Sequence, residues 1–436
     1  MEDTKSITVN TVIRRLANYI SIKSIDRTLL PSKKRDIRDS IRALQKVFQT
    51  VTCMDDPVND DETDRTKSLM HIENSLANLI VPQSFSQSPI YIFKLLSSYS
   101  EIHEMLGHPE KAIENYKETI KLAQKYNQHD MVAVAQQRLG QLLLDQNNWE
   151  SAVEQLELAM AYYDRIQSPV RLKDCYCQLG IAYQRMGKYA ETIDYYQQAL
   201  KLAEQIKDIS SIAKLNMFLG VIYRILDDKT KSTQLLEHSH ALYQQLDNVR
   251  GIVDTLNQLS LTNLQQSNYQ SALSGFNKCI AYCRKIGDVE MLAYVNLNKA
   301  DFYLKVGDPR NAAKYCTEAL ENIISGNLVL VLAKACSLLS RIFKLFHQDE
   351  IAKQLFTETM TIYQNLNLPL GLANCCSDYT DILIQTEHYD EAMECYQMAR
   401  QIYLELKLDH YADSLDRHVD YAVTAENIPL HVPQHK

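Results

Sequence analysis

The sequence is 436 residues long, 46% hydrophobic and 23% charged, with a formal net charge of −8. This length suits two domains or one elongated array, and the composition is that of a folded soluble protein. The acidic balance argues against a protein that holds the phosphate backbone of nucleic acids on a basic face. With only 11 Gly and 10 Pro, the chain favours helices over hairpins and long loops.

Residues 1–90 are predicted to form an N-terminal helical segment, with helices near 10–22, 33–51 and 66–80. Residues 54–65 form an acidic, proline-containing loop between the last two helices. Basic residues gather in the first part of the segment: Arg14, Arg15, Lys33, Lys34, Arg35, Arg38 and Arg42. A solvated helix face that caps the following array explains them, and a patch for nucleic acid or a membrane is the alternative.

From residue 91 onward the sequence repeats every 40 residues without a gap. Two antiparallel helices can approach closely only where the side chains at their crossing are short. Three columns of the repeat contain only small residues: Ser100, Gly140, Gly180, Gly220, Ser260, Ala300, Ser340 and Thr380; Ala112, Ala152, Thr192, Ser232, Ala272, Ala312, Ala352 and Ala392; Thr119, Ala159, Ala199, Ser239, Cys279, Ala319, Thr359 and Ala399. These columns predict helix pairs that cross at the small positions.

Larger residues follow the same interval, and short breaks such as MGKY and NNWE separate the two helices of each unit. One position holds Tyr116, Leu156, Tyr196, Leu236, Phe276, Cys316, Phe356 and Tyr396. The position before the first small column is mostly Leu, and Lys299 breaks it, which predicts a packing defect or a snorkelling stem. The pattern therefore predicts eight helix-turn-helix repeats over 91–411.

Residues 412–436 are predicted to form a capping helix followed by a disordered tail. The helix is expected over Asp409 to Val423, and polar residues such as Asp416 and His418 replace much of its apolar pattern. A polar-faced cap is what the end of a repeat array requires.

The copy LGIAYQRMGKYAETIDYYQQAL (Leu179–Leu200) shows the repeat most clearly. Small columns, a Gly or polar turn, and then Tyr and Ala resemble the tetratricopeptide repeat, whose usual unit is about 34 residues. The longer unit resembles the subclass of Partner of Inscuteable and rapsyn, and also the bacterial aspartate-phosphatase peptide receptors. The resemblance implies an all-α fold: a right-handed α-solenoid with an N-terminal helical segment and a C-terminal capping helix.

Motifs that carry catalytic chemistry are missing from the sequence. It contains no phosphate-binding loop, no dinucleotide fingerprint, no zinc-protease motif and no nucleophile elbow. No second cysteine pair joins Cys279 and Cys283 at zinc-site spacing, so neither a metal nor a cofactor is expected. No apolar run is long enough to span a membrane. Ten cysteines without a secretory signal indicate a reducing, cytoplasmic location.

In the tetratricopeptide family the first helix of each repeat lines a concave groove. The resemblance therefore implies that a partner is bound by Ile181, Met217, Val221, Arg224, Leu261, Leu264, Leu297, Leu304, Lys334, Arg341 and Lys344. The apolar members, in repeats three to six, would form a hydrophobic stripe. Lys334, Arg341 and Lys344, in repeat seven, would receive an acidic flank of the ligand. The alternative is that some of these side chains pack against neighbouring first helices.

The leading hypothesis is a non-enzymatic scaffold or adaptor that holds a peptide segment of a partner protein in this groove. The second is a peptide-sensing regulatory receptor whose N-terminal bundle acts on another protein. The third is a structural subunit of a large assembly. Nucleic acid is not an expected partner. The identity of the partner and the oligomeric state stay open.

Overall fold

The structure, a computed structural model, describes residues 96, 100, 103, 108–326 and 329–426. The helices expected within residues 1–90, the acidic loop at 54–65 and the tail after residue 426 lie outside these residues. The described residues form two compact units that divide between Leu219 and Gly220. We refer to them as the N-terminal unit, up to Leu219, and the C-terminal unit, from Gly220.

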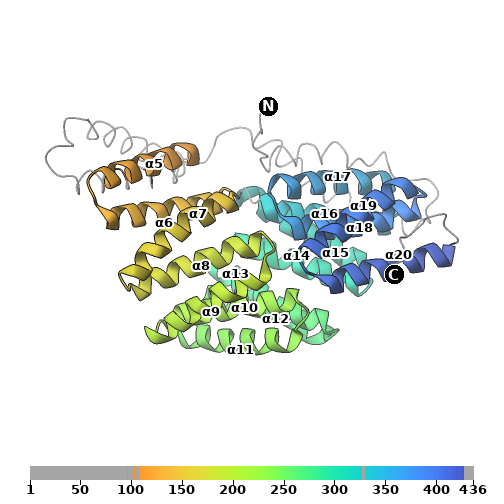
Figure 1. The fold of residues 1–436 in the computed structure, drawn as a ribbon. Coiled ribbons are helices and arrows are strands. Elements are labelled where there is room, and N and C mark those ends of the chain that lie inside the picture. The colour runs from red at the N-terminus through yellow and green to blue at the C-terminus, as the bar shows by residue number, and fades with distance from the viewer. Residues whose placement is uncertain (1–95, 97–99, 101–102, 104–107, 327–328, 427–436) are drawn as a thin grey trace, which may run out of the picture. The chain divides into compact units, whose positions relative to one another are not determined.

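Helices of 17 or 18 residues make up both units, and neighbours in the chain lie side by side within each unit (Figure 1). The N-terminal unit contains α5 (Pro109–Lys125), α6 (His129–Asp145), α7 (Trp149–Arg165), α8 (Pro169–Arg185) and α9 (Tyr189–Gln205). The division between the units falls within α10 (Ile209–Ile225). No described residue belongs to a strand, and the predicted all-α repeat fold is confirmed.

The C-terminal unit continues the same alternation. It contains α11 (Lys229–Gln245), α12 (Val249–Gln265), α13 (Tyr269–Ile286), α14 (Val289–Lys305), α15 (Pro309–Gly326), α16 (Val329–Leu345), α17 (Asp349–Asn365), α18 (Pro369–Gln385), α19 (Tyr389–Glu405) and α20 (Asp409–Glu426). Helix α20 is the expected capping helix. It begins at Asp409, the residue at which the sequence placed its start.

The turns between helices share one geometry and reveal a period shorter than the repeat. A residue with positive φ follows each helix from α5 to α19 except α15, whose following residues are not described, and these residues keep a spacing of 20 positions: Asn127, Asn147, Gln167, Gly187, Lys207, Asp227, Asp247, Ser267, Gly287, Gly307, His347, Asn367, Glu387 and Lys407. After α9, the amide of Asp208 donates to the carbonyl of Ala203 at 2.9 Å. This is the Schellman arrangement, which satisfies the last carbonyls of a helix. Two such 20-residue units make each 40-residue repeat.

The three small columns lie where the helices meet, as predicted, and all of their members are buried. Gly180 of α8 shows why they are small. A Cβ at this position would lie 2.4 Å from two ring carbons of Tyr196, which is itself 0% exposed. The small residue of each first helix thus accommodates the large residue of the second helix.

Lys299 is buried although its column is otherwise mostly leucine. Its Nζ donates to Asn277 Oδ1 at 2.6 Å and to the hydroxyl of Tyr315 at 2.8 Å. The ammonium is therefore held by protein groups and does not reach the solvent, so the expectation of a snorkelling stem is wrong.

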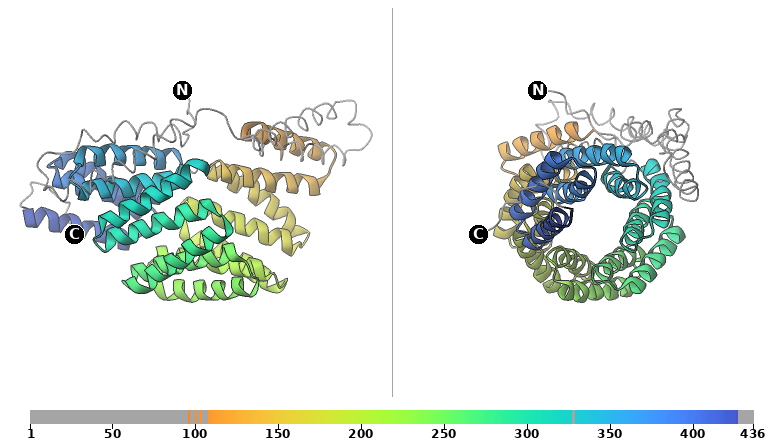
Figure 2. Two further views of the ribbon diagram at one scale, coloured as in Figure 1. Left: turned by 180° about the vertical axis from the view of Figure 1, so that it is seen from behind. Right: turned by 90° about the vertical axis from the view of Figure 1, so that its right-hand side faces the viewer.

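Even-numbered helices occupy the inner side of the C-terminal unit. Its helices follow a curve (green to blue in Figure 2, right), and direct contacts join α12 to α14, α14 to α16, α16 to α18 and α18 to α20. Among the described helices, no two odd-numbered helices pack against each other as these even-numbered helices do. Because helices crowd on the inside of a curve, the even-numbered helices form its concave side.

We predict that Gly180→Ala destabilises the N-terminal unit by about 1–3 kcal/mol, because the added methyl overpacks the site against Tyr196. Helix propensity alone predicts the opposite, a gain of about 1 kcal/mol. Thermal and urea unfolding followed by circular dichroism would measure the difference. The cost should shrink in a Tyr196→Ala background, where the ring is missing. A stabilising Gly180→Ala would contradict this account of the small column.

We predict that Lys207→Gly stabilises the protein by about 0.5–1 kcal/mol, because glycine adopts the left-handed conformation without steric cost. The matched control is Lys201→Gly, at an exposed position inside α9, which should cost about 1 kcal/mol. Equal effects at both positions in urea unfolding would show that the turn geometry contributes nothing.

Candidate functional site

All residues expected to line the groove lie on even-numbered helices. Ile181 of α8 and Met217 of α10 belong to the N-terminal unit, and both are partly exposed. The other expected residues belong to the C-terminal unit and occupy α10, α12, α14 and α16. We therefore describe the site as the inner face of the C-terminal unit.

The expected apolar stripe is only partly available to a ligand. Val221, Leu261 and Leu304 are partly exposed. Leu264 is 4% exposed and Leu297 is 0% exposed, so the expectation that these two side chains face a groove is wrong. Leu264 packs in a cluster with core residues of α12, α13 and α14, which leaves it no surface for a partner.

The expected basic spot on α16 is largely neutralised from within. The Nη1 of Arg341 lies 2.8 Å from Asp301 Oδ1, and its Nε lies 3.9 Å from Asp378 Oδ2. The carboxylates of Asp381 and Asp378 attract the ammonium of Lys344 electrostatically. Arg341 and Lys344 therefore already face carboxylates of the protein, and they are poor candidates for receiving an acidic flank.

The pKa values of three titratable groups in this network are shifted: Asp378 and Lys344 toward their neutral forms, and His418 toward its charged form. Burial raises the pKa of Asp378 to about 6, although Arg341 opposes the shift. On the capping helix α20, His418 Nε2 lies 2.9 Å from Asp381 Oδ1, and this hydrogen bond raises the pKa of the imidazole. Burial lowers the pKa of Lys344, and Asp381 opposes that shift.

A row of polar side chains links the even-numbered helices, its two asparagines are buried, and the sequence did not single it out. The side-chain amide of Asn298 donates to Asn257 Oδ1 at 2.9 Å, and Lys334 in turn donates to Asn298. Lys334 also lies over the ring of Tyr294, 4.9 Å from its centroid. The signal was present, because asparagine is unfavourable inside an apolar helix unless a partner satisfies it. These contacts bridge α12, α14 and α16.

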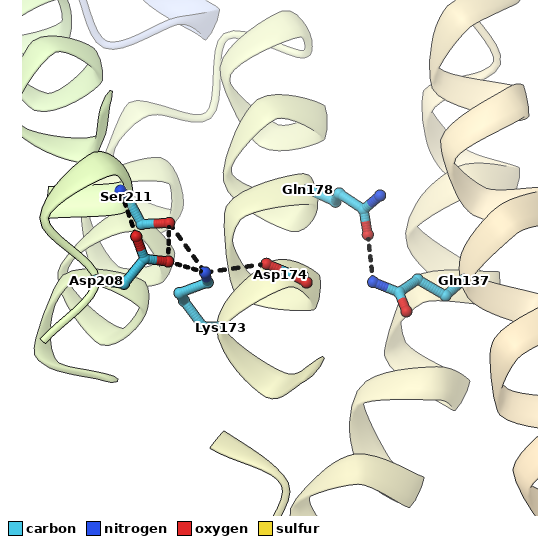
Figure 3. A network of polar contacts seen from close by, with 6 residues as sticks. All are labelled: Gln137, Lys173, Asp174, Gln178, Asp208 and Ser211. Atoms are coloured by element: carbon cyan, nitrogen blue, oxygen red, sulfur yellow. Dashed lines mark hydrogen bonds and ion pairs between the residues drawn. The ribbon is translucent and has the colours of Figure 1, made fainter. Parts of the chain in front are cut away.

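The N-terminal unit holds a second polar network that the sequence missed (Figure 3). Lys173 is buried, and its Nζ lies 2.6 Å from Asp208 Oδ2, 2.9 Å from Ser211 Oγ and 3.3 Å from Asp174 Oδ1. The hydrogen bond from Lys173 lowers the pKa of Asp208 to about 2. Beside it, Gln137 donates to Gln178 at 3.2 Å.

The position of Lys173 within the repeat explains why this network is local. The equivalent residues are Ala133, Ala213, Val253, Ala293, Ala333 and Ala373, and all of them are buried. A charged residue in a column of small apolar residues was the sequence signal. The ion pair joins α8 to the residue that precedes α10, and thus ties two successive repeats together.

The described cysteines are buried or partly buried free thiols. Cys279 and Cys283 belong to the same apolar cluster, and burial raises the pKa of Cys283 to about 11. A thiol with so high a pKa is a poor metal ligand and a poor nucleophile. These two residues therefore act as small core residues.

Sequence comparison matches residues 91–165 and 174–244 to the tetratricopeptide repeat. A second match, over residues 259–326, is to anaphase-promoting complex subunit 5. The repeated helix pairs of the structure agree with the first match. The match and the structure together identify tetratricopeptide repeats in this part of the chain, and the resemblance to the subclass of Partner of Inscuteable and rapsyn stays a prediction. None of the described helices combines the length and apolar character needed to cross a membrane.

Solved structures with a similar fold include aspartyl phosphate phosphatase F from Bacillus subtilis, with a TM-score of 0.53, 13% identity, and coverage of 92% of this chain and 96% of that chain. The apo form of RapI has a TM-score of 0.54 and 13% identity, and the match covers 63% of this chain and 98% of that chain. Transcriptional activator NprA of Geobacillus stearothermophilus is 23% identical over 160 residues, which are 37% of each chain. The present chain thus spans little more than a third of that relative's length.

We predict that Asp378→Asn raises the melting temperature at about pH 7.5 and has almost no effect at about pH 4. The pKa of Asp378 is raised in the folded state to about 6, from an ordinary value of 3.8. Ionisation of this carboxyl therefore destabilises the fold increasingly as the pH rises from about 4 to about 6, and fully above that range. Circular dichroism melts across this range would measure the effect.

The control is Glu237→Gln, which removes an exposed carboxyl of α11. This variant should follow the wild type at every pH. An Asp378→Asn protein that melts below the wild type at neutral pH would contradict the assignment of a destabilising buried charge.

Proposed function

We propose that the inner face of the C-terminal unit binds an extended segment of a partner protein, and that the protein is a non-enzymatic scaffold or adaptor. The observation that carries this proposal is the set of partly exposed side chains on the even-numbered helices of this unit, which comprises the apolar Val221, Leu261 and Leu304 and the cations Arg224 and Lys334. Repeat proteins of this kind use extended concave surfaces for binding.

The spacing of these helices suits an extended peptide. Packed helix axes lie about 8–10 Å apart and an extended chain rises about 3.3 Å per residue, so each even-numbered helix would face about three ligand residues. The four helices α10, α12, α14 and α16 would then hold a segment of about ten residues.

Apolar anchors of the ligand would contact Val221, Leu261 and Leu304, because these side chains are only partly covered by the protein itself. We propose a cytoplasmic location, in keeping with the free thiols of the described cysteines. The peptide-sensing receptor stays an alternative hypothesis, since the N-terminal bundle that it requires falls outside the described residues.

We predict that the double variant Leu261→Asp, Leu304→Asp lowers the affinity for a partner at least about ten-fold, because two charges replace apolar contact area. Both positions are partly exposed, so the fold should survive, whereas Leu264→Asp would disrupt the core. Affinity purification from native lysate with quantitative mass spectrometry would compare the variant with the wild type, after circular dichroism shows equal helicity.

The matched control is Leu246→Asp, at the end of α11, where the leucine is 39% exposed and lies outside the inner face. Its set of partners should equal that of the wild type. Partners that are lost from the control and retained by the double variant would move the interface to the repeat edges, and the proposal would be wrong.

A second candidate is a structural subunit of a large assembly. The observation in its favour is the match of residues 259–326 to anaphase-promoting complex subunit 5, which spans one repeat and its neighbouring helices. Gel filtration of native lysate distinguishes the two candidates. A subunit would migrate only with a large complex, whereas an adaptor would also occur free.

A further inference from the structure

The cations of the inner face fall into two groups. Arg341 and Lys344 face carboxylates of neighbouring helices, as described above. Arg224 and Lys334 form no ion pair with any carboxylate among the described residues. The first two cations are balanced by carboxylates of the protein, whereas the charges of the second two are not.

Arg224 is the clearer case. It is partly buried on α10, and its Nη2 donates a hydrogen bond to Gln258 Oε1 at 3.3 Å. Its Nε is shielded from solvent and has no hydrogen-bond partner among the described residues. The groups that act on it electrostatically are the phenols of Tyr294 and Tyr411. Burial lowers the pKa of Arg224, as expected for a desolvated cation without a counterion.

Lys334 is the second such cation, and it shares a neighbour with Arg224. Its ammonium lies over the ring of Tyr294 and donates to Asn298. Neither neighbour carries a negative charge. Tyr294 thus acts electrostatically on Arg224 of α10, and its ring lies beneath the ammonium of Lys334 of α16.

A partly buried cation without a counterion is costly for the folded protein, because it has lost water without gaining an opposite charge. Binding of an anion removes that cost. In surroundings of low dielectric constant the attraction is also stronger than at an exposed site. The charge pattern therefore favours an anionic group in the ligand.

We propose that Arg224 and Lys334 bind a carboxylate of the partner segment, so that the ligand of the inner face is an acidic peptide. This inference rests on the proposed function. It replaces the sequence-based expectation that Arg341 and Lys344 receive the acidic flank. The carboxylate belongs to an acidic side chain or to a chain terminus, and the experiment below distinguishes these two sources.

The test begins with a display library of random peptides, about ten residues long, selected on the full-length protein. Each enriched peptide is synthesised with two twins: one with every Asp and Glu replaced by Asn and Gln, and one with an amidated C-terminus. Dissociation constants are then measured for the wild type, Arg224→Gln, Lys334→Gln and the control Lys278→Gln, which removes an exposed lysine of α13.

The wild type should bind the acidic peptide at least about ten-fold more tightly than one of its two twins, the Asn/Gln twin or the amidated twin. A difference of this size corresponds to the loss of a charge-assisted hydrogen bond. This preference should shrink in Arg224→Gln and in Lys334→Gln, and persist in Lys278→Gln. Arg224→Lys should recover part of it, because the charge returns without the planar guanidinium. The free Arg224→Gln protein should melt no lower than the wild type, since a purely structural arginine would lower the melting temperature.

Two results would overturn the proposal, and they differ in meaning. If the Asn/Gln twin and the amidated twin both bind as tightly as the enriched peptide, the acidic ligand is refuted while peptide binding stands. Failure to enrich any peptide would refute the proposed function, and the acidic ligand with it.

Discussion

The close approach of two helices at a small residue is the constraint on which the structure depends. Where Gly180 meets Tyr196, the ring fills the space that a Cβ would need. The same exchange of a small residue for a large one recurs every 40 residues, so each repeat buries its aromatic or aliphatic side chain in the same place. Once that contact is fixed, the 20-residue spacing of left-handed turns sets each helix beside the next. The even-numbered helices then share one side, on which the candidate site is built.

The fold could be predicted from the sequence because its determinants are local and repeated. Small residues at fixed intervals report directly on helix crossings, and all of them are buried as expected. The site could be predicted only in part. Leu264 and Leu297 occupy positions that face the neighbouring even-numbered helices, and whether such a side chain is covered depends on what the next repeat contributes. Val221 and Leu261 occupy comparable positions and retain exposed surface.

Charge on the inner face shows the same limit. A count of basic residues in repeat seven treats Lys334, Arg341 and Lys344 as equivalent. In the structure Asp301, which lies 40 residues before Arg341, pairs with it, whereas the described contacts of Lys334 are with the neutral Asn298 and Tyr294. Alternating signs at one position of successive repeats were visible in the sequence, and they identify pairs that neutralise each other. Lys173 is a related case, because a charge within a column of alanines requires a buried partner, which Asp208 supplies.

The central claim is that the partner lies along the even-numbered helices, and site-specific photo-crosslinking tests it most directly. A photo-reactive amino acid is introduced at Leu304 on the inner face and, separately, at Leu246 at the end of α11. After irradiation in native lysate, the account predicts a discrete crosslinked partner from position 304 and none from position 246. A partner crosslinked from position 246 and not from position 304 would contradict the claim that the inner face is the binding surface.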